Sequence, residues 1–173
     1  QGYKNTSSTK KSGEKPHFFS KFIKNFTGDD GSNNSFSLAI QDVSNDKYLK
    51  LYKINSNLVD YNTNTLENHI NFTHENDDLF FGFNASIFET LKESYEDKYE
   101  YILPEITIDK NLLNNDKVGN LDLQTNISTH LYDTNKLQNF IVNDFDWRSK
   151  DIFFESGLNT KILGNLRNIN YEI

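Results

Sequence analysis

Alternation of apolar and polar side chains is the feature that most constrains how this chain can fold. Between residues 120 and 132, one parity carries only apolar residues and threonines: Leu121, Leu123, Thr125, Ile127, Thr129 and Leu131. The other parity is polar: Asn120, Asp122, Gln124, Asn126, Ser128 and His130. A strand places the two sets on opposite faces, whereas a helix of period ~3.6 would mix them. The segment therefore predicts a β-strand with one apolar face and one polar face.

The same alternation recurs over 66–75 and 79–91, and a polar turn at 74–78 separates the two runs. This arrangement predicts an antiparallel hairpin over 65–91. Phe80 and Phe88 stand near the ends of a parity that also carries glycine and polar residues. Aromatic residues at strand ends are typical of the interfacial girdle of a membrane barrel.

Other parts of the chain are less regular, and their predicted elements follow from turn residues. We expect strands over 17–26 and 35–43, joined by a Gly/Asp-rich loop at 28–34. The segment 44–64 is interpreted as a short helical turn or a packed loop. Pro104 predicts a bulge or bend in a strand over 99–109, because proline cannot donate to the ladder. Turns are predicted at 111–119, 132–135 and 148–151, and a last long strand from Ile152 with Ile152, Phe154, Leu158 and Ile162 on its apolar face.

These elements predict an all-β fold, an antiparallel meander of long strands that forms part of a large transmembrane β-barrel. Residues 1–16 are expected to be a polar flexible segment, and 17–173 a partial outer-membrane barrel of about seven or eight strands. The alternating runs exceed the ~5–6 residues of ordinary strands and reach the ~9–11 of a tilted membrane strand. Their apolar parities carry no charge over 66–74, 79–87 and 121–131. A soluble β-sandwich binding domain would share this charge pattern, so it stays an alternative.

Composition narrows the class of protein. The net charge of −7 argues against a nucleic-acid partner, and the absence of cysteine excludes disulfides and thiolate chemistry. A chain of 173 residues with 14 Phe and 9 Tyr, yet a mean hydropathy of −0.72, fits a barrel with a lipid face and a wet interior. The chain begins at Gln1 and contains no Met and no signal peptide. We therefore expect it to be a fragment of a longer protein.

No catalytic motif of the G-x-S-x-G or H-E-x-x-H kind is present. We expect no enzyme activity and assign no catalytic, cofactor-binding or metal-ligating residues. His69 and His74 are predicted on opposite faces of one strand, and His130 on the polar face. Asp29, Asp30 and Asn33 could bind calcium loosely, but a solvated turn is the preferred interpretation. An acidic strand end and loop, with Glu89, Glu93, Glu96 and Asp97, is interpreted as a solvated rim.

Polar side chains of the predicted strands form the candidate lumen: Glu67, Asn120, Asp122, Gln124 and Asn126. They would offer hydrogen bonds to sugars or contacts to a plug protein. Simple hydration of the interior explains them equally well.

Three short motifs, in this order, resemble the LPS-assembly protein LptD, or organic solvent tolerance protein, family. The first is Val43-Ser44-Asn45-Asp46-Lys47-Tyr48-Leu49, and the second is Tyr99-Glu100-Tyr101-Ile102-Leu103-Pro104-Glu105-Ile106. The third is Trp147, followed by Gly157-Leu158 and Asn168-Ile169-Asn170-Tyr171. The resemblance covers most of 17–173.

The resemblance implies an arc of a barrel in the cell outer membrane that transports lipopolysaccharide into the outer leaflet. The partners implied are lipopolysaccharide, an LptE-like plug lipoprotein, a periplasmic LPS bridge protein acting through a separate N-terminal domain, and outer-membrane lipids. The alternatives are another outer-membrane barrel, namely a porin-like channel or the secretion barrel of an adhesin, and the soluble β-sandwich.

Overall fold

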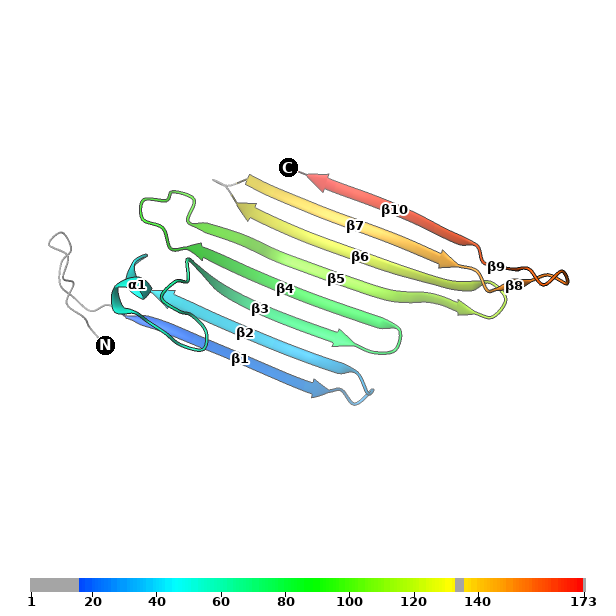
Figure 1. Ribbon diagram of the computed structural model, residues 1–173, viewed down its shortest axis with the longest axis horizontal. Helices are drawn as coiled ribbons and strands as arrows, with labels where there is room; N and C mark the ends of the chain where they lie inside the picture. The colour runs from blue at the N-terminus through cyan, green and yellow to red at the C-terminus, as the bar shows by residue number, and fades with distance from the viewer. Residues whose placement is uncertain (1–15, 133–135, 173) are drawn as a thin grey trace.

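The computed structural model describes residues 16–132 and 136–172, most of which lie in one antiparallel sheet. Eight strands follow each other in the order β1-β2-β3-β4-β5-β6-β7-β10, a meander that Figure 1 shows nearly face-on. The sheet is not closed, because β1 and β10 form its two edges and do not pair with each other. The predicted all-β antiparallel meander is confirmed.

The strands of this sheet are 10 to 17 residues long. Their bounds are β1 His17–Thr27, β2 Asn33–Val43, β3 Thr65–Glu75, β4 Leu79–Thr90, β5 Tyr99–Asn115, β6 Gly119–Tyr132, β7 Lys136–Arg148 and β10 Leu163–Glu172. The hairpin predicted over 65–91 corresponds to β3 and β4, and the alternating segment 120–132 lies in β6. The turn predicted at 132–135 falls mostly outside the described residues, as do residues 1–15 of the predicted flexible segment.

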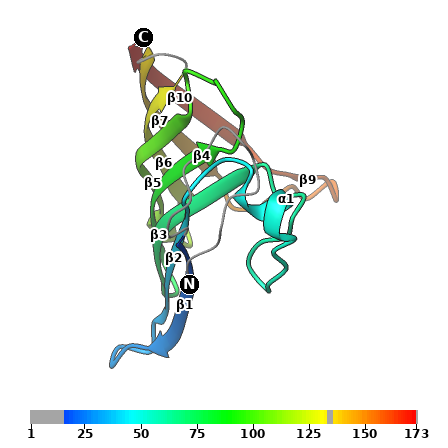
Figure 2. The ribbon, with the colours of Figure 1, turned by 90° about the vertical axis from the view of Figure 1, so that its left-hand side faces the viewer.

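Two further elements lie at opposite ends of the sheet. A single helical turn, α1 Tyr48–Tyr52, occupies the connection between β2 and β3, as one reading of 44–64 predicts. At the other end, β8 Ile152–Phe153 and β9 Asn159–Thr160 form a separate two-stranded hairpin. Figure 2 shows that α1 and this hairpin project to the same side of the sheet.

The prediction of a long strand from Ile152 is wrong. The chain reverses at Gly157, whose φ of +82° is a conformation that side-chain-bearing residues rarely adopt. The Gly157 amide donates to the Phe154 carbonyl and the Phe154 amide to the Leu158 carbonyl, each at 2.9 Å. The last strand therefore begins only at Leu163, where it pairs with Arg148 of β7.

Two irregularities shape β5. The ladder slips between Ile102 and Glu105, on either side of Pro104, so the predicted bulge is confirmed. The turn predicted over 111–119 is shorter than expected, because β5 continues to Asn115 after a second slip beyond Asn111. Asn115 then ends the strand with its side-chain oxygen, which accepts from the Lys117 amide at 2.8 Å.

A small core seals one end of the sheet. Tyr48, Leu49 and Leu66 are at most 1% exposed, and Val43, Val59 and Leu91 complete the cluster. Phe19 of β1, Tyr52 and Ile54 pack against it. This core fixes the 44–64 segment but covers only the end of the sheet where α1 lies.

Candidate functional site

The sheet has one face that is apolar along its middle, which we call the apolar face. Residues in register across neighbouring antiparallel strands share a face. One such row crosses six strands and contains only apolar side chains: Phe36, Phe72, Phe83, Ile106, Ile127 and Ile141. Ile70 and Ile141, on interior strands, are still 39% and 42% exposed. Away from the α1 end, where Leu66 is buried in the small core, no second layer of the described residues therefore covers this face.

The opposite surface, which we call the polar face, is defined in the same way. A row through the same five strands from β2 to β6 reads Ser37, Asn71, Asn84, Glu105 and Ser128. Its side chains bond to each other across strands, as Asn84 does to Glu105 at 3.3 Å. The sheet thus has one oily and one hydrogen-bonded surface.

The polar face carries ion pairs where β6, β7 and β10 meet. Asp122 accepts from Asn111 at 2.7 Å and pairs with Arg148. Asp144 accepts both guanidinium hydrogen bonds of Arg167, at 2.6 and 3.0 Å, and its side chain is only 7% exposed. A bidentate geometry of this kind is the strongest that carboxylate and arginine can form.

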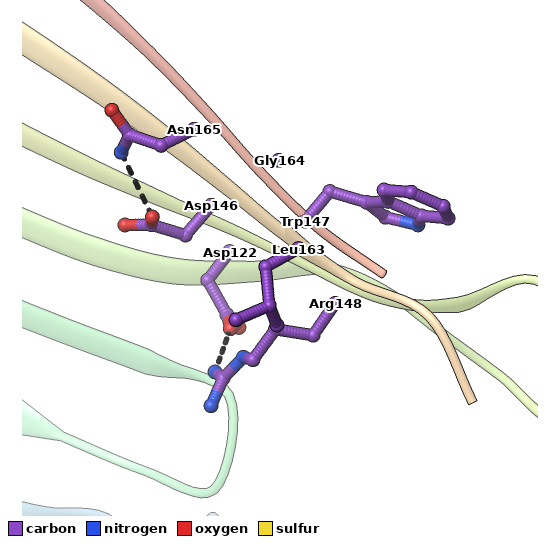
Figure 3. A pocket seen from close by; sticks show the side chains of 7 residues that line it. All are labelled: Asp122, Asp146, Trp147, Arg148, Leu163, Gly164 and Asn165. Atoms are coloured by element: carbon purple, nitrogen blue, oxygen red, sulfur yellow. Dashed lines mark hydrogen bonds and ion pairs between the residues drawn. The ribbon is translucent and has the colours of Figure 1, made fainter. Parts of the chain in front are cut away.

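A pocket of about 580 Å³ opens at the end of this ladder. Figure 3 shows Asp122 bonded to Arg148 and Asp146 bonded to Asn165, with Trp147 turned away from both pairs. Leu163 and Gly164 complete the lining. Both carboxylates of the lining are already bonded within the chain, Asp122 to Arg148 and Asp146 to the amide of Asn165.

The candidate lumen residues lie on the polar face, as their register shows. Asn126 accepts from Thr107 at 3.1 Å, and Glu67 bonds His69 at 2.9 Å. Gln124 lies in register with Asp144. The buried Oδ1 of Asn120 has no hydrogen-bond partner within the part of the chain that the structure describes.

The histidines do not converge. His69 bonds Ser37 on the polar face, whereas His74 bonds Asn34 and is in register with Phe81 on the apolar face. This confirms that His69 and His74 lie on opposite faces. His130 bonds Glu100 at 2.6 Å on the polar face, as its parity predicts.

The turn that carries Asp29 and Asp30 closes on itself. The Asp30 carboxylate accepts from the Ser32 hydroxyl at 2.6 Å and from the Ser32 amide at 3.1 Å, and Asn33 begins β2. These bonds, led by the one from the Ser32 hydroxyl, lower the pKa of Asp30. Over residues 16–132 and 136–172, no group of three or more His, Asp or Glu side chains could hold a metal ion.

The interpretation of Glu89 as part of a solvated rim is wrong. Glu89 is 8% exposed and pairs with Lys98 at 2.6 Å, and Lys98 also pairs with Asp46 at 2.8 Å. Partial burial disfavours the Lys98 charge, but the bonds to Asp46 and Glu89 outweigh it and raise the pKa of Lys98. Glu93 of the same loop pairs with Lys47 at 2.6 Å. The Asp46–Lys98–Glu89 network and the Lys47–Glu93 pair therefore connect the residues just before α1 to the end of β4 and to the loop that precedes β5.

The described ranges 16–132 and 136–172 contain no helix long and apolar enough to cross a bilayer. Scanning models of known protein families, curated proteins and solved structures gives no match to this chain. The resemblance to the LptD family therefore stays a prediction.

Proposed function

We propose that this sheet is an arc of the wall of an outer-membrane β-barrel. Its apolar face contacts lipid acyl chains and its polar face lines a water-filled lumen. The observation that carries the proposal is the uncovered apolar face, which runs through the row from Phe36 to Ile141 on long, paired strands. In a soluble protein, an exposed apolar surface of this extent would need a partner or would aggregate.

Strand length supports the same proposal. A membrane strand needs about 9–11 residues when tilted, and the shortest of the eight strands has 10. A sandwich instead packs two sheets face to face. The only second sheet among the described residues is the small β8–β9 pair, so a sandwich is disfavoured.

Within this class, we propose that the barrel assembles lipopolysaccharide in the outer leaflet. The ordered motifs described above support this role. So does the chemistry of the polar face, whose amides, carboxylates and arginines can exchange hydrogen bonds with sugar hydroxyls and phosphates. The proposed partners are lipopolysaccharide, an LptE-like plug lipoprotein and a periplasmic LPS bridge protein.

Membrane fractionation tests the barrel. The protein should sediment with outer membranes, resist extraction by carbonate, and migrate faster on a gel unless it is boiled in detergent. Recovery in the soluble periplasmic fraction would end the proposal in favour of a soluble domain.

Depletion in the native host tests the lipopolysaccharide role. Loss of the protein should lower the amount of lipopolysaccharide on the cell surface, as measured by labelling intact cells with probes that do not enter them. Porin abundance should be unchanged. If surface lipopolysaccharide stays normal and the purified protein conducts ions across planar bilayers, it is a channel instead.

A further inference from the structure

The apolar part of the apolar face runs obliquely to the strands, between two borders of polar residues. The inference drawn from this rests on the proposed membrane location. On β2, the apolar residues Phe36, Leu38 and Ile40 are flanked by Asn34 at one end and Asp42 at the other. All five share a face, because their spacing is two. The apolar stretch of β2 is therefore centred on Leu38.

The same stretch lies elsewhere on β10. The row that starts at Phe36 on β2 reaches Asn170 on β10 after Ile141 of β7. The apolar residue of this face of β10 is Leu166, four residues from Asn170, and both Asn168 and Glu172 are polar. The apolar stretch has thus moved along the strand direction between the two strands.

Both polar borders move in the same direction. The border at the α1 end passes from Asp42 and Glu89 to Asn139 on β7 and then to Asn170 on β10. The opposite border passes from Asn34 and His74, which are in register, to Lys110 on β5, which lies two residues further along the ladder from the α1 end. On β7, Asn143 interrupts this face, where it accepts from the Thr125 hydroxyl at 2.8 Å, and Phe145 and Trp147 then continue the face to the end of the strand.

The displacement gives an angle. From Leu38 to Leu166 the centre moves six residues along the ladder, or about 20 Å at ~3.4 Å per residue. Six strand-to-strand steps separate β2 from β10, or about 29 Å at ~4.8 Å per step. The apolar band therefore crosses the strands at about 35° from the perpendicular, which matches the ~35–45° tilt of membrane barrels.

We infer that acyl chains contact a diagonal band that runs from Phe36–Ile40 on β2, through Leu79–Ile87 on β4, to Phe145 and Leu166 on β7 and β10. The ends of β6, β7 and β10 that lie at the α1 end of the sheet are then outside the hydrocarbon. Leu131 and Leu137 belong to these ends. The bilayer contact is thus set by position along the diagonal rather than by side-chain hydrophobicity alone.

One row of residues distinguishes this diagonal band from a band perpendicular to the strands, which we call a horizontal band. Ile87, Tyr101, Leu131 and Leu137 are in register across β4 to β7. On the diagonal, Ile87 lies in the hydrocarbon and Leu137 lies outside it. A horizontal band would place both at the same depth. Leu137 is 47% exposed, so a label there perturbs little.

Collision accessibility of spin labels tests the inference. The chain has no cysteine, so single cysteines at Ile87, Leu137 and Phe145 can each carry a nitroxide in protein reconstituted into phosphatidylcholine vesicles. Oxygen should relax the Ile87 and Phe145 labels several-fold more than a water-soluble nickel complex does. The order should reverse at Leu137.

Three other results would each overturn the inference. If Ile87 and Leu137 both favour oxygen, or if Phe145 favours nickel while Ile87 favours oxygen, the diagonal is overturned but the barrel stands. If all three favour nickel, both the inference and the proposed barrel fail.

Discussion

At the scale of single residues, a few positions hold the sheet in register. Gly119 begins β6 with a φ of +107°, and a Cβ there would overlap the backbone carbonyl of Arg148. The ion pairs of the polar face join the same strands. Arg167 lies in register with Asp144, and Arg148 lies two residues along β7 from the register partner of Asp122. Local backbone geometry and cross-strand charge thus fix β6, β7 and β10 relative to each other.

Substituting Gly119→Ala should destabilise the protein by about 1–3 kcal/mol, because the residue is strained and the Cβ displaces the β7 backbone. Urea titration of the vesicle-bound protein would measure it. Gly164→Ala is the control, since its Cβ would meet only the Trp147 ring at an ordinary 3.6 Å. Equal midpoints for the two variants would show that Gly119 carries no such constraint.

Removing Arg167 should cost more stability than removing Arg148. Arg167→Ala leaves the nearly buried Asp144 without its partner, whereas Asp122, the partner of Arg148, is 34% exposed and keeps its bond from Asn111. Urea midpoints of both variants give the comparison. Adding Asp144→Asn to Arg167→Ala should recover part of the loss, and an additive double variant would contradict the coupling.

At the scale of elements, sequence periodicity predicts the strands and fails where tertiary contacts decide. β6 alternates without interruption, so its bounds and faces follow from the sequence alone. The 152–162 segment holds several apolar residues, but only the structure reveals that Gly157 reverses the chain. Glu89 belongs to an acidic stretch, which predicts exposure to solvent. Its burial instead depends on Lys98 and on Asp46, which is 43 positions earlier in the chain. Alternation carries no information about such long-range pairing.

The α1 element offers a matched pair of substitutions. Leu49→Ala should loosen the end core by about 2–5 kcal/mol, because Leu49 is 1% exposed and fills the cluster. Leu51→Ala, on the same helical turn but 47% exposed, should change little. Limited proteolysis within 53–63 would report the loosening. Equal cleavage rates for the two variants would show that the core does not hold this segment.

The Lys98 pair makes this end of the sheet sensitive to high pH. The pKa of Lys98 is raised in the folded protein, so its charged form stabilises fully below the unfolded pKa of ~10.4 and the effect is lost as pH rises through the folded value. Protease protection of 53–63 should therefore hold from pH 7 to 9. Lys98→Gln should lower it across that range, and Lys47→Gln, at a pair exposed 62% and 44%, should not. A Lys98→Gln protein as protected as the parent would remove the pair from the account.

At the scale of the whole molecule, one sheet presents an apolar face and a polar face. Its two surfaces differ because alternation persists in register across neighbouring strands, so that rows such as Phe36–Ile141 form instead of scattered apolar spots. The edge strands depart from this pattern, with Lys24 on the apolar face of β1 and Asn168 on that of β10. Figure 1 shows both edges open, and these two edges are where a barrel would continue.

Spin-label accessibility along β6 tests the central claim most directly. Single nitroxides at Leu123, Gln124, Asn126 and Ile127, in protein reconstituted into vesicles, would sample both parities within five residues. The account predicts that Leu123 and Ile127 are relaxed mainly by oxygen dissolved in the hydrocarbon, and Gln124 and Asn126 mainly by a water-soluble nickel complex. Labels at Leu123 and Ile127 that favour nickel, with Gln124 and Asn126 favouring oxygen, would contradict it.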